Sequence, residues 1–307
     1  MWNRIARIFN KTDILKLHML LLNDITVIIK ALYKGWILLI LGFLAAILMG
    51  VVLGIIGGGG SILTVPILVY LMAVPADIAT GYSLLIVGAT AAYGAISYFK
   101  QGLVDVKSSI IFAIPSIMAV YLTRAYLMPN VPDTLNIATF SFSKNVAIMV
   151  FFAVLMLVSA AMMLKKAYAE PITLQQAGSD EVITISPNIL LIAVEGAFVG
   201  VITGVLGAGG GFLIIPALVL LMGMPMKKAV GASLFIIALK SLIGFTGDLQ
   251  SGIDLDIPLL GMMLLATFIG MTISKKIAGN LEGQTLQKFF AYFTLAIAVF
   301  IIVKEIL

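Results

Sequence analysis

Long apolar stretches separated by short polar connections dominate the pattern of this chain. A helix needs about 20 mostly apolar residues to cross a hydrocarbon core about 30 Å thick. Runs of roughly that length are found at 36–56, 78–99, 108–127, 145–164, 188–207, 229–247, 257–274 and 286–303. We expect each run to form a spanning helix. The pattern therefore predicts an all-α, multi-pass membrane protein.

Two further apolar runs, 61–73 and 212–224, are shorter. At about 1.5 Å per residue, each covers only about 20 Å, which is too short for a comfortable crossing. We therefore expect half-helices or re-entrant segments. Backbone that leaves helical hydrogen bonding inside a membrane is tolerated only where protein or a water-filled cavity satisfies it. Both runs thus mark candidate binding sites.

The sequence contains an internal repeat. Residues 50–84 align with residues 200–234 without a gap, at a constant offset of 150 residues, and 17 of the 35 aligned positions are identical. Shared apolar composition would match leucines and valines at scattered positions, but it would not align glycines, two prolines and a serine in register. The chain is therefore interpreted as a duplication. The repeats are inverted if the short helices count as spans and parallel if they turn back, and the sequence leaves both open.

Polar positions divide the chain around these repeats. Residues 1–35 carry six basic side chains and are interrupted by acids, which predicts a basic amphipathic segment at the membrane surface. Residues 165–187 are polar and contain two prolines, which predicts a linker. The first transmembrane repeat is then 36–164 and the second is 188–307. Basic residues at the helix ends conflict on orientation, because the basic N-terminus with Lys165 and Lys166 favours one arrangement while Lys227, Lys228, Lys275 and Lys276 favour another.

Each repeat combines a glycine cluster, a short helix with a proline and a second proline. The two copies read GVVLGIIGGGGSILTVPILVYLMAVP and GVITGVLGAGGGFLIIPALVLLMGMP, and an Ala-x-Gly-x-Ser-Leu sequence follows each of them. These residues resemble the TauE/SafE sulfite exporter family, also called the 4-toluene sulfonate uptake permeases. The resemblance runs from about residue 36 to the C-terminus. It implies a multi-pass protein of the cell (inner) membrane that moves sulfite, sulfonates or related sulfur-containing organic anions.

The glycine clusters are the predicted substrate site. Glycine allows positive φ at little steric cost, and a helix that begins after such a break presents unpaired N–H groups and a positive dipole end. Broken helices from two repeats bring such ends together near the midplane in several transporter folds. We therefore expect the clusters to face each other across a bound anion, with the two prolines at the helix breaks. The predicted substrate-binding residues are Gly57, Gly58, Gly59, Gly60, Ser61, Ser83, Gly207, Gly209, Gly210, Gly211, Ser233 and Lys240, and the helix-break prolines are Pro66 and Pro216.

Charged residues inside the apolar runs are costly to bury alone. Lys240 is the predicted counter-charge for the anion. Glu195 is the predicted proton-coupling residue, and a structural ion pair between the two is the competing interpretation. Arg124 lies toward a helix end, where we expect its side chain to reach the membrane surface. Asp248 falls beside a connection, where we expect it to be solvated.

Composition narrows the function classes. With 62% hydrophobic and 11% charged residues and a mean hydropathy of +1.17, the chain is too apolar for a soluble fold of its length. It has no cysteine and one histidine, His18, so we expect no disulfide, no metal site, no cofactor and no catalytic residues. The net charge of +5 is interpreted as contact with lipid headgroups rather than nucleic acid.

These patterns predict a secondary transporter whose partners are a small anion and the lipid bilayer, with proton coupling through Glu195. A passive anion channel is the first alternative. An intramembrane enzyme is less favoured because no catalytic groups converge, and a membrane scaffold would leave Lys240 and Glu195 unexplained. The exact substrate, the direction of transport, the coupling ion and the formation of a homo-oligomer stay open.

Overall fold

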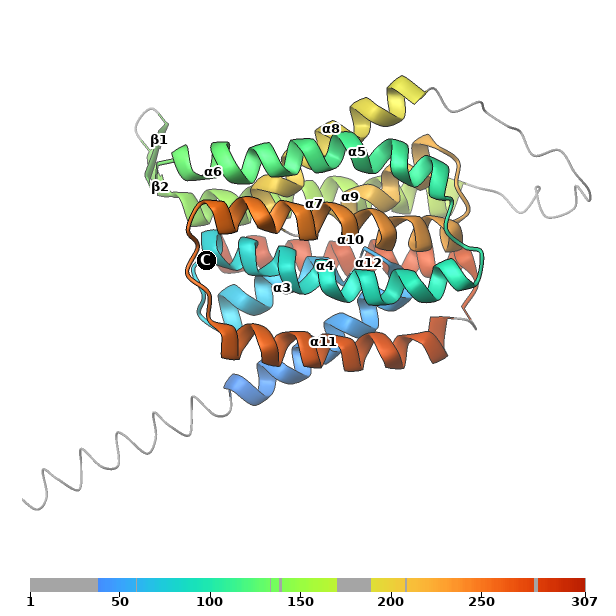
Figure 1. Ribbon diagram of the computed structural model, residues 1–307, viewed down its shortest axis with the longest axis horizontal. Helices are drawn as coiled ribbons and strands as arrows, with labels where there is room; N and C mark the ends of the chain where they lie inside the picture. The colour runs from blue at the N-terminus through green and yellow to red at the C-terminus, as the bar shows by residue number, and fades with distance from the viewer. Residues whose placement is uncertain are drawn as a thin grey trace, which may run out of the picture.

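The computed structural model is a bundle of helices aligned along one direction (Figure 1). It describes residues 38–58, 60–132, 134–137, 140–169, 189–207, 209–278 and 281–306. Within them, seven helices are long and apolar enough to cross a membrane: Leu38–Ile56, Ala76–Lys100, Val106–Asn130, Lys144–Tyr168, Met226–Gln250, Ile257–Ile277 and Gly283–Glu305. The prediction of a helical, multi-pass membrane protein is confirmed.

The helix bounds follow the apolar runs closely. In chain order the main helices after Leu38–Ile56 are α4 (Ala76–Lys100), α5 (Val106–Leu122), α7 (Lys144–Ala169), α8 (Ile189–Leu206), α10 (Met226–Gln250), α11 (Ile257–Ala278) and α12 (Gly283–Ile306). α8, at the predicted span 188–207, is shorter than the seven spanning helices. A π-helix, η2 (Thr123–Leu127), and a short helix, α6 (Met128–Asn130), extend α5. A hairpin that the apolar pattern did not predict, β1 (Thr134–Ile137) with β2 (Phe140–Ser143), leads into α7. The predicted segment 1–35 lies outside the described residues, as does residue 170 onward of the predicted linker.

Two short helices occupy the predicted positions. α3 (Ser61–Pro66) continues directly as a π-helix, η1 (Ile67–Leu71), and α9 (Gly211–Pro216) continues in the same way as η4 (Ala217–Leu221). Proline lacks an N–H and its ring crowds the carbonyl four residues earlier, so a helix commonly widens locally beside it. Pro66 and Pro216 therefore mark a change from α- to π-geometry, and the chain remains helical through both.

α4 and α10 form the centre of the bundle. In each, 72% of the spanning window is buried, compared with 33–50% in the other five spanning helices. Gly81, near the start of α4, faces Asp248 near the end of α10, whereas Gly231, near the start of α10, faces Leu103 just after α4. The two helices, which occupy equivalent positions at the offset of 150, therefore run antiparallel.

The bundle has two ends of different charge. α4 and α11 finish where α10 begins, because Tyr98, Lys275 and Lys227 line one cavity there. Lys288 Nζ lies 5.3 Å from the ring centre of Tyr168, which places the end of α7 beside the first turns of α12. We call this the lysine-rich end, and it is on the right in Figure 1. Its basic residues are Lys100, Lys107, Lys165, Lys166, Lys227, Lys228, Lys275, Lys276 and Lys288.

The opposite end, which we call the acidic end, brings together the starts of α4 and α7 and the finish of α10. Asn145 Oδ1 accepts a hydrogen bond from Asp77 N, and Tyr82 Oη donates to Asp254 O. The carboxylates at this end are Asp77, Asp248, Asp254, Asp256 and Glu305. Lys165, Lys166, Lys227 and Lys228 therefore lie at the same end of the molecule. The helix Leu38–Ile56, which follows the basic segment 1–35 in the sequence, begins at the acidic end, where Gly42 packs against Met72.

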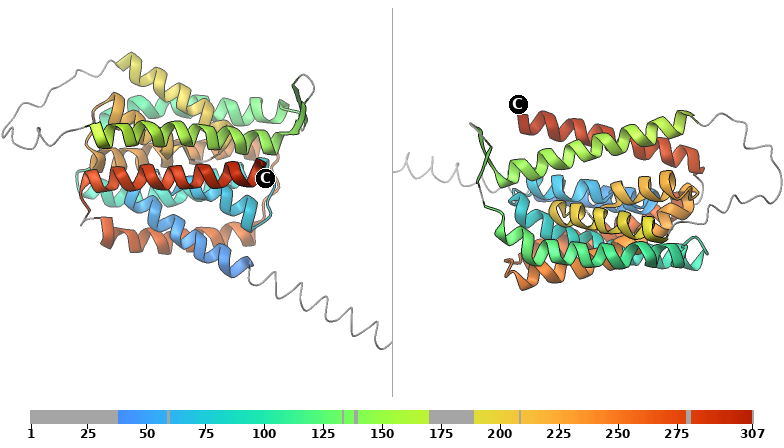
Figure 2. Two further views of the ribbon diagram at one scale, coloured as in Figure 1. Left: turned by 180° about the vertical axis from the view of Figure 1, so that it is seen from behind. Right: turned by 90° about the horizontal axis from the view of Figure 1, so that it is seen from above.

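Outer helices surround this core. α8 lies along α5, and α12 pairs with α7 on one face of the bundle (Figure 2). Large apolar side chains such as Met118, Leu265 and Phe300 remain exposed on these outer helices. An apolar exterior on helices of this length fits a lipid environment.

Candidate functional site

The two glycine-rich breaks meet in the interior of the bundle. A Cβ atom added to Gly58 would collide with the backbone of Gly211, and one added to Gly211 would collide with the backbone of Gly58. Only two glycines allow such close backbone contact. The α3 and α9 helices begin on opposite sides of this contact and run toward opposite ends of the bundle, so their N-termini converge. The two clusters therefore meet in direct backbone contact, and the binding of an anion between them stays a prediction.

Further pairs of predicted site residues surround the contact between Gly58 and Gly211, which we call the crossing. A Cβ on Gly57 would lie 2.6 Å from Ser233 Oγ, and a Cβ on Gly209 would lie 3.2 Å from Ser61 Cβ. Gly57, Gly207, Gly209 and Gly210 all have φ between +63° and +79°, as expected for a break built from glycine. Gly60 has an ordinary helical φ of −67°. Gly59 lies outside the described residues.

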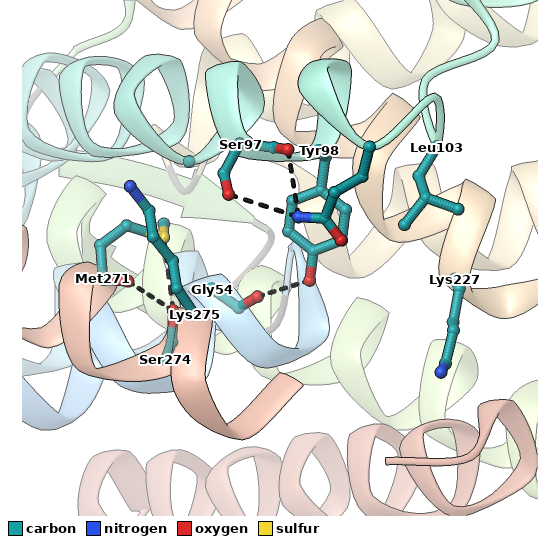
Figure 3. A pocket seen from close by; sticks show the side chains of 10 residues that line it. Gly54, Ser97, Tyr98, Leu103, Lys227, Met271, Ser274 and Lys275 are labelled. Carbon is teal, nitrogen blue, oxygen red and sulfur yellow. Dashed lines mark hydrogen bonds between the residues drawn. The ribbon is translucent and has the colours of Figure 1, made fainter. Parts of the chain in front are cut away.

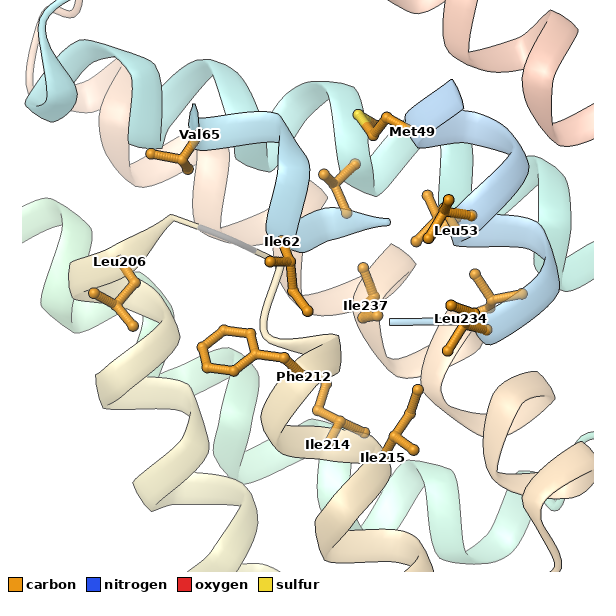
Figure 4. Packing of buried hydrophobic residues seen from close by; sticks show 14 of the residues in the cluster. Met49, Leu53, Ile62, Val65, Leu206, Phe212, Ile214, Ile215, Leu234 and Ile237 are labelled. Atoms are coloured by element: carbon orange, nitrogen blue, oxygen red, sulfur yellow. The ribbon is translucent and has the colours of Figure 1, made fainter. Parts of the chain in front are cut away.

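Hydroxyl groups near the crossing differ in their partners. Ser61 Oγ donates to Gly58 O at 2.6 Å, and Ser233 Oγ donates to Val230 O at 2.9 Å. Both hydroxyls therefore satisfy their own backbone. Ser83 Oγ is fully buried on α4 and has no hydrogen-bond partner, and Ser241 Oγ on α10 is in the same condition. These two groups retain unused hydrogen-bonding capacity inside the bundle. Around the crossing, apolar side chains such as Ile62, Phe212 and Ile237 form the buried core (Figure 4).

Lys240 reaches the crossing from α10. Its side chain is completely buried, and Nζ donates to Thr203 Oγ1 at 2.6 Å. A Cβ on Gly210 would lie 2.5 Å from the same Nζ, so the ammonium group lies where α9 begins. No carboxylate of the described residues forms an ion pair with Lys240. Sequence reasoning missed Thr203. The equivalent residue in the first repeat is Leu53. A polar residue at a position that is apolar in the other repeat could have identified Thr203 from the sequence.

Glu195 does not pair with Lys240. It lies on α8 eight residues before Thr203, which is about 12 Å along the helix. Its side chain is half-buried and Oε2 has no hydrogen-bond partner. The interpretation of a structural Glu195–Lys240 ion pair is therefore wrong in this conformation, because the two groups lie too far apart along the bundle.

Arg124 and Asp248 behave differently from the sequence prediction. Arg124 is 2% exposed and donates from Nη1 to Asp248 Oδ1 at 3.3 Å. Asp248 itself is only 6% exposed. Both expectations, a side chain reaching the membrane surface and a solvated aspartate, are wrong. α10 packs against α5 and against η2, the π-helix that carries Arg124. Both side chains therefore point into the bundle although they lie near helix ends.

A cavity of about 110 Å³ opens at the lysine-rich end (Figure 3). Tyr98 Oη donates to Gly54 O at 2.8 Å, and Gln101 Nε2 donates to Ser97 O at 3.1 Å. Lys275 Nζ lies 3.8 Å above the ring centre of Tyr93 at the rim. The polar residues of the lining are Ser97, Tyr98, Gln101, Lys227, Ser274 and Lys275. In the part of the chain that the structure describes, no cluster of three or more acidic or histidine side chains is arranged to hold a metal ion.

Comparison with known proteins places the chain in a family. The profile described as "Sulfite exporter TauE/SafE" matches residues 41–301, which include both glycine-rich breaks and most or all of each spanning helix. The chain belongs to the TauE/SafE family. Its members and the relatives below are membrane transporters rather than enzymes, so this chain is a multi-pass membrane transport protein.

Several TauE/SafE relatives are similar to most of the chain. "Probable membrane transporter protein YunE" of Bacillus subtilis (strain 168) is 32% identical over 70% of this chain and 78% of its own length. A "Probable membrane transporter protein" of Xylella fastidiosa (strain 9a5c) is 30% identical over 64% of this chain and 68% of its own length. YdhB of Bacillus subtilis (strain 168), with the same description, is 27% identical over 83% of this chain and 96% of its own length. No solved structure matches the chain.

Proposed function

We propose that this protein is a secondary transporter for a small sulfur oxyanion, sulfite or a sulfonate, in the cell (inner) membrane. The anion binds where the two half-helices begin, beside Lys240. The observation that carries the proposal is the environment of Lys240, a fully buried ammonium group whose hydrogen-bond partner is the neutral Thr203 hydroxyl. A buried cation without a counter-charge is unfavourable. An oxyanion at this position supplies the missing charge.

The backbone at the crossing supports the same ligand. The helices that start at Ser61 and Gly211 have no side-chain cap, and their dipoles place partial positive charge at the contact of the two breaks. Ser83, which is equivalent to Ser233 in the other repeat, has a buried hydroxyl without a partner. Together these groups can donate several hydrogen bonds to a tetrahedral or pyramidal oxyanion. Donors of this kind hold anionic substrates at broken helices in other transporter folds.

The direction of the equivalent helices supports a carrier rather than a channel. We propose that the two halves are inverted repeats, because α4 and α10, which occupy equivalent positions, run antiparallel. Inverted repeats allow one half to rock against the other around a fixed central site, which exposes that site to one side at a time. The lysine-rich end is assigned to the cytoplasm, because cytoplasmic segments carry an excess of lysine and arginine.

Glu195 is the proposed proton-coupling group. Its half-buried carboxyl lies on α8, the helix that also carries Thr203, and Oε2 has no hydrogen-bond partner. Protonation of the Glu195 carboxylate removes a negative charge from α8, the helix that contacts Lys240 through Thr203. Coupling to a proton gradient would then act through α8.

The test is uptake of labelled sulfite, methanesulfonate, sulfate and chloride into proteoliposomes that contain the purified protein, with and without a pH gradient. We expect saturable uptake of sulfite or methanesulfonate, accelerated by the gradient. Anion movement that never saturates and ignores the gradient would identify the passive channel instead. Absence of movement for every anion of the panel would contradict the proposed function.

A further inference from the structure

The two ends of the bundle carry different residues at equivalent positions. At the offset of 150, Tyr98 and Lys227 at the lysine-rich cavity correspond to Asp248 and Asp77 at the acidic end. α5 and α11 are equivalent at an offset of 151. Gly204 packs against Thr123 just as Gly54 packs against Ser274, and Asp105 and Asp256 cap the two helices in the same way. Lys275 therefore corresponds to Arg124.

This correspondence has an electrostatic consequence. At the acidic end, the cation Arg124 meets a carboxylate across the gap, forms an ion pair and is buried. At the lysine-rich end, Lys275 lines the cavity together with Tyr98 and a second cation, Lys227, and its Nζ lies over the ring of Tyr93 rather than beside a carboxylate. Neither Lys227 nor Tyr98 supplies a negative charge that would balance Lys275. The two lysines therefore leave positive charge at the rim of an open cavity.

We propose that this cavity is an anion-capture site at the cytoplasmic mouth of the pathway, with Lys227 and Lys275 as its charged ligands. The inference rests on the proposed function and adds a second, peripheral site to it. Along α10, Lys227 lies 13 residues from Lys240, which is about 20 Å, so the cavity is separate from the crossing. Gln101 and Ser97 add polar groups to the lining. The preferred ligand is a small oxyanion that retains part of its hydration.

We expect loss of charge at the capture site and loss of charge at the central site to change the transport kinetics differently. A charged mouth of one sign raises the local concentration of an oppositely charged substrate and accelerates its association. Removal of the charge therefore raises KM and leaves the maximal rate nearly unchanged. The effect also weakens in salt, because charges exposed to solvent are screened within about 8 Å at physiological ionic strength.

The experiment compares two double variants in the sulfite uptake assay. Lys227→Gln with Lys275→Gln removes the two lining charges, whereas Lys228→Gln with Lys276→Gln removes two neighbouring charges that do not line the cavity. Both variants lose two positive charges from the same end. We expect KM to rise about tenfold in the lining variant at low salt and less than twofold in the control. Addition of about 0.5 M potassium gluconate should remove most of this difference.

Three results would overturn the inference. Equal changes of KM in both double variants would indicate a general surface potential. An unchanged KM in the lining variant, with normal uptake by the unmodified protein, would reject capture and leave the proposed function intact. A change of KM seen only in vesicles with phosphatidylglycerol, and not in pure phosphatidylcholine, would assign the lysines to a lipid headgroup instead.

A separate observation concerns the acidic end, where Arg124 and Asp248 join helices from different halves of the chain. Asp77 and Asp248 each have a carboxylate oxygen without a hydrogen-bond partner, and so do Nε and Nη2 of Arg124. Nη2 lies against Gly207, the first residue of the second glycine-rich break. We infer that this ion pair closes the extracytoplasmic mouth, and that its separation is required for the central site to open to that side.

Cysteine labelling tests this closure, because the chain has no cysteine of its own. Thr80 is buried against Gly207 beside the ion pair, so a Thr80→Cys variant should react slowly with a membrane-impermeant thiol reagent. Addition of Asp248→Asn, or of Arg124→Gln, should increase the labelling rate about tenfold or more. Ser159→Cys, which is buried beside Phe212, is the control. Unchanged labelling at position 80, or an equal increase at position 159, would contradict the closure.

Discussion

At the scale of single residues, some features of the site could be predicted from the sequence and others could not. Lys240 is one that could. Its position inside an apolar run predicted a functional cation, and the structure places it at the start of α9. The positive φ of Gly57, Gly207, Gly209 and Gly210 was also predictable, since the residue type itself permits it. The burial of Arg124 and Asp248 was not predictable in this way. Whether a residue near a helix end faces water or a neighbouring helix depends on packing that distant segments provide.

Ala73 offers a test at the residue scale. It has φ of 55°, whereas its equivalent in the second repeat, Gly223, has φ of 65°. A left-handed conformation costs about 1–3 kcal/mol for a residue with a Cβ, and glycine avoids that cost. Since glycine also loses more backbone entropy on folding, we expect Ala73→Gly to stabilise the protein by about 0.5–1 kcal/mol. Gly223→Ala should destabilise it by a similar amount.

Thermal unfolding in detergent measures both substitutions. Nothing lies within 4 Å of a Cβ built on Gly223, so its substitution tests backbone conformation without a clash. A decrease in melting temperature for Ala73→Gly would contradict the expected strain.

At the scale of elements, the spanning helices and the two short helices were predictable because length and apolarity determine them. Of the eight predicted spans, seven are helices long enough to cross a membrane, whereas the predicted span 188–207 contains the shorter apolar helix Leu190–Leu206. The π-geometry after Pro66 and Pro216 was not evident, because proline is compatible with several local distortions. The hairpin of β1 and β2 was also missed, since residues 134–143 have no turn sequence specific enough to identify a strand pair.

The contact between Gly58 and Gly211 is the critical packing between elements. Any side chain at either position would collide with backbone, which cannot move as a flexible side chain can. We expect Gly58→Ala and Gly211→Ala each to destabilise the protein by about 1–3 kcal/mol and to reduce transport. Gly261→Ala is the matched control, because a Cβ there meets nothing within 4 Å and α11 is helical at that position.

Melting temperature and uptake should be measured on the same preparations. Gly261→Ala should change stability by no more than about 1 kcal/mol and leave transport unaffected. If Gly211→Ala behaves like this control, the close crossing of the two breaks is wrong.

At the scale of the whole molecule, the sequence identified two related halves but not their relative direction. That direction depends on whether each short helix turns back, and apolar pattern alone cannot report it. The antiparallel α4 and α10 provide this information, and they place nine lysines at one end of the bundle. The asymmetry of the two ends follows from the same arrangement. Among the described residues, Lys227 and Lys275 at one mouth have no carboxylate partner, and the other mouth has a buried ion pair.

The central claim is that an oxyanion binds at the crossing of the half-helices beside Lys240. Equilibrium binding of labelled sulfite to the purified protein tests it most directly, with Lys240→Met compared to Lys228→Met at the exposed start of the same helix. A charge-assisted hydrogen bond in a buried site is worth about 1.5–3 kcal/mol. We therefore predict that Lys240→Met weakens sulfite binding by about 10- to 100-fold while Lys228→Met binds normally. Equal affinity in the two variants, with both proteins folded, would contradict the account.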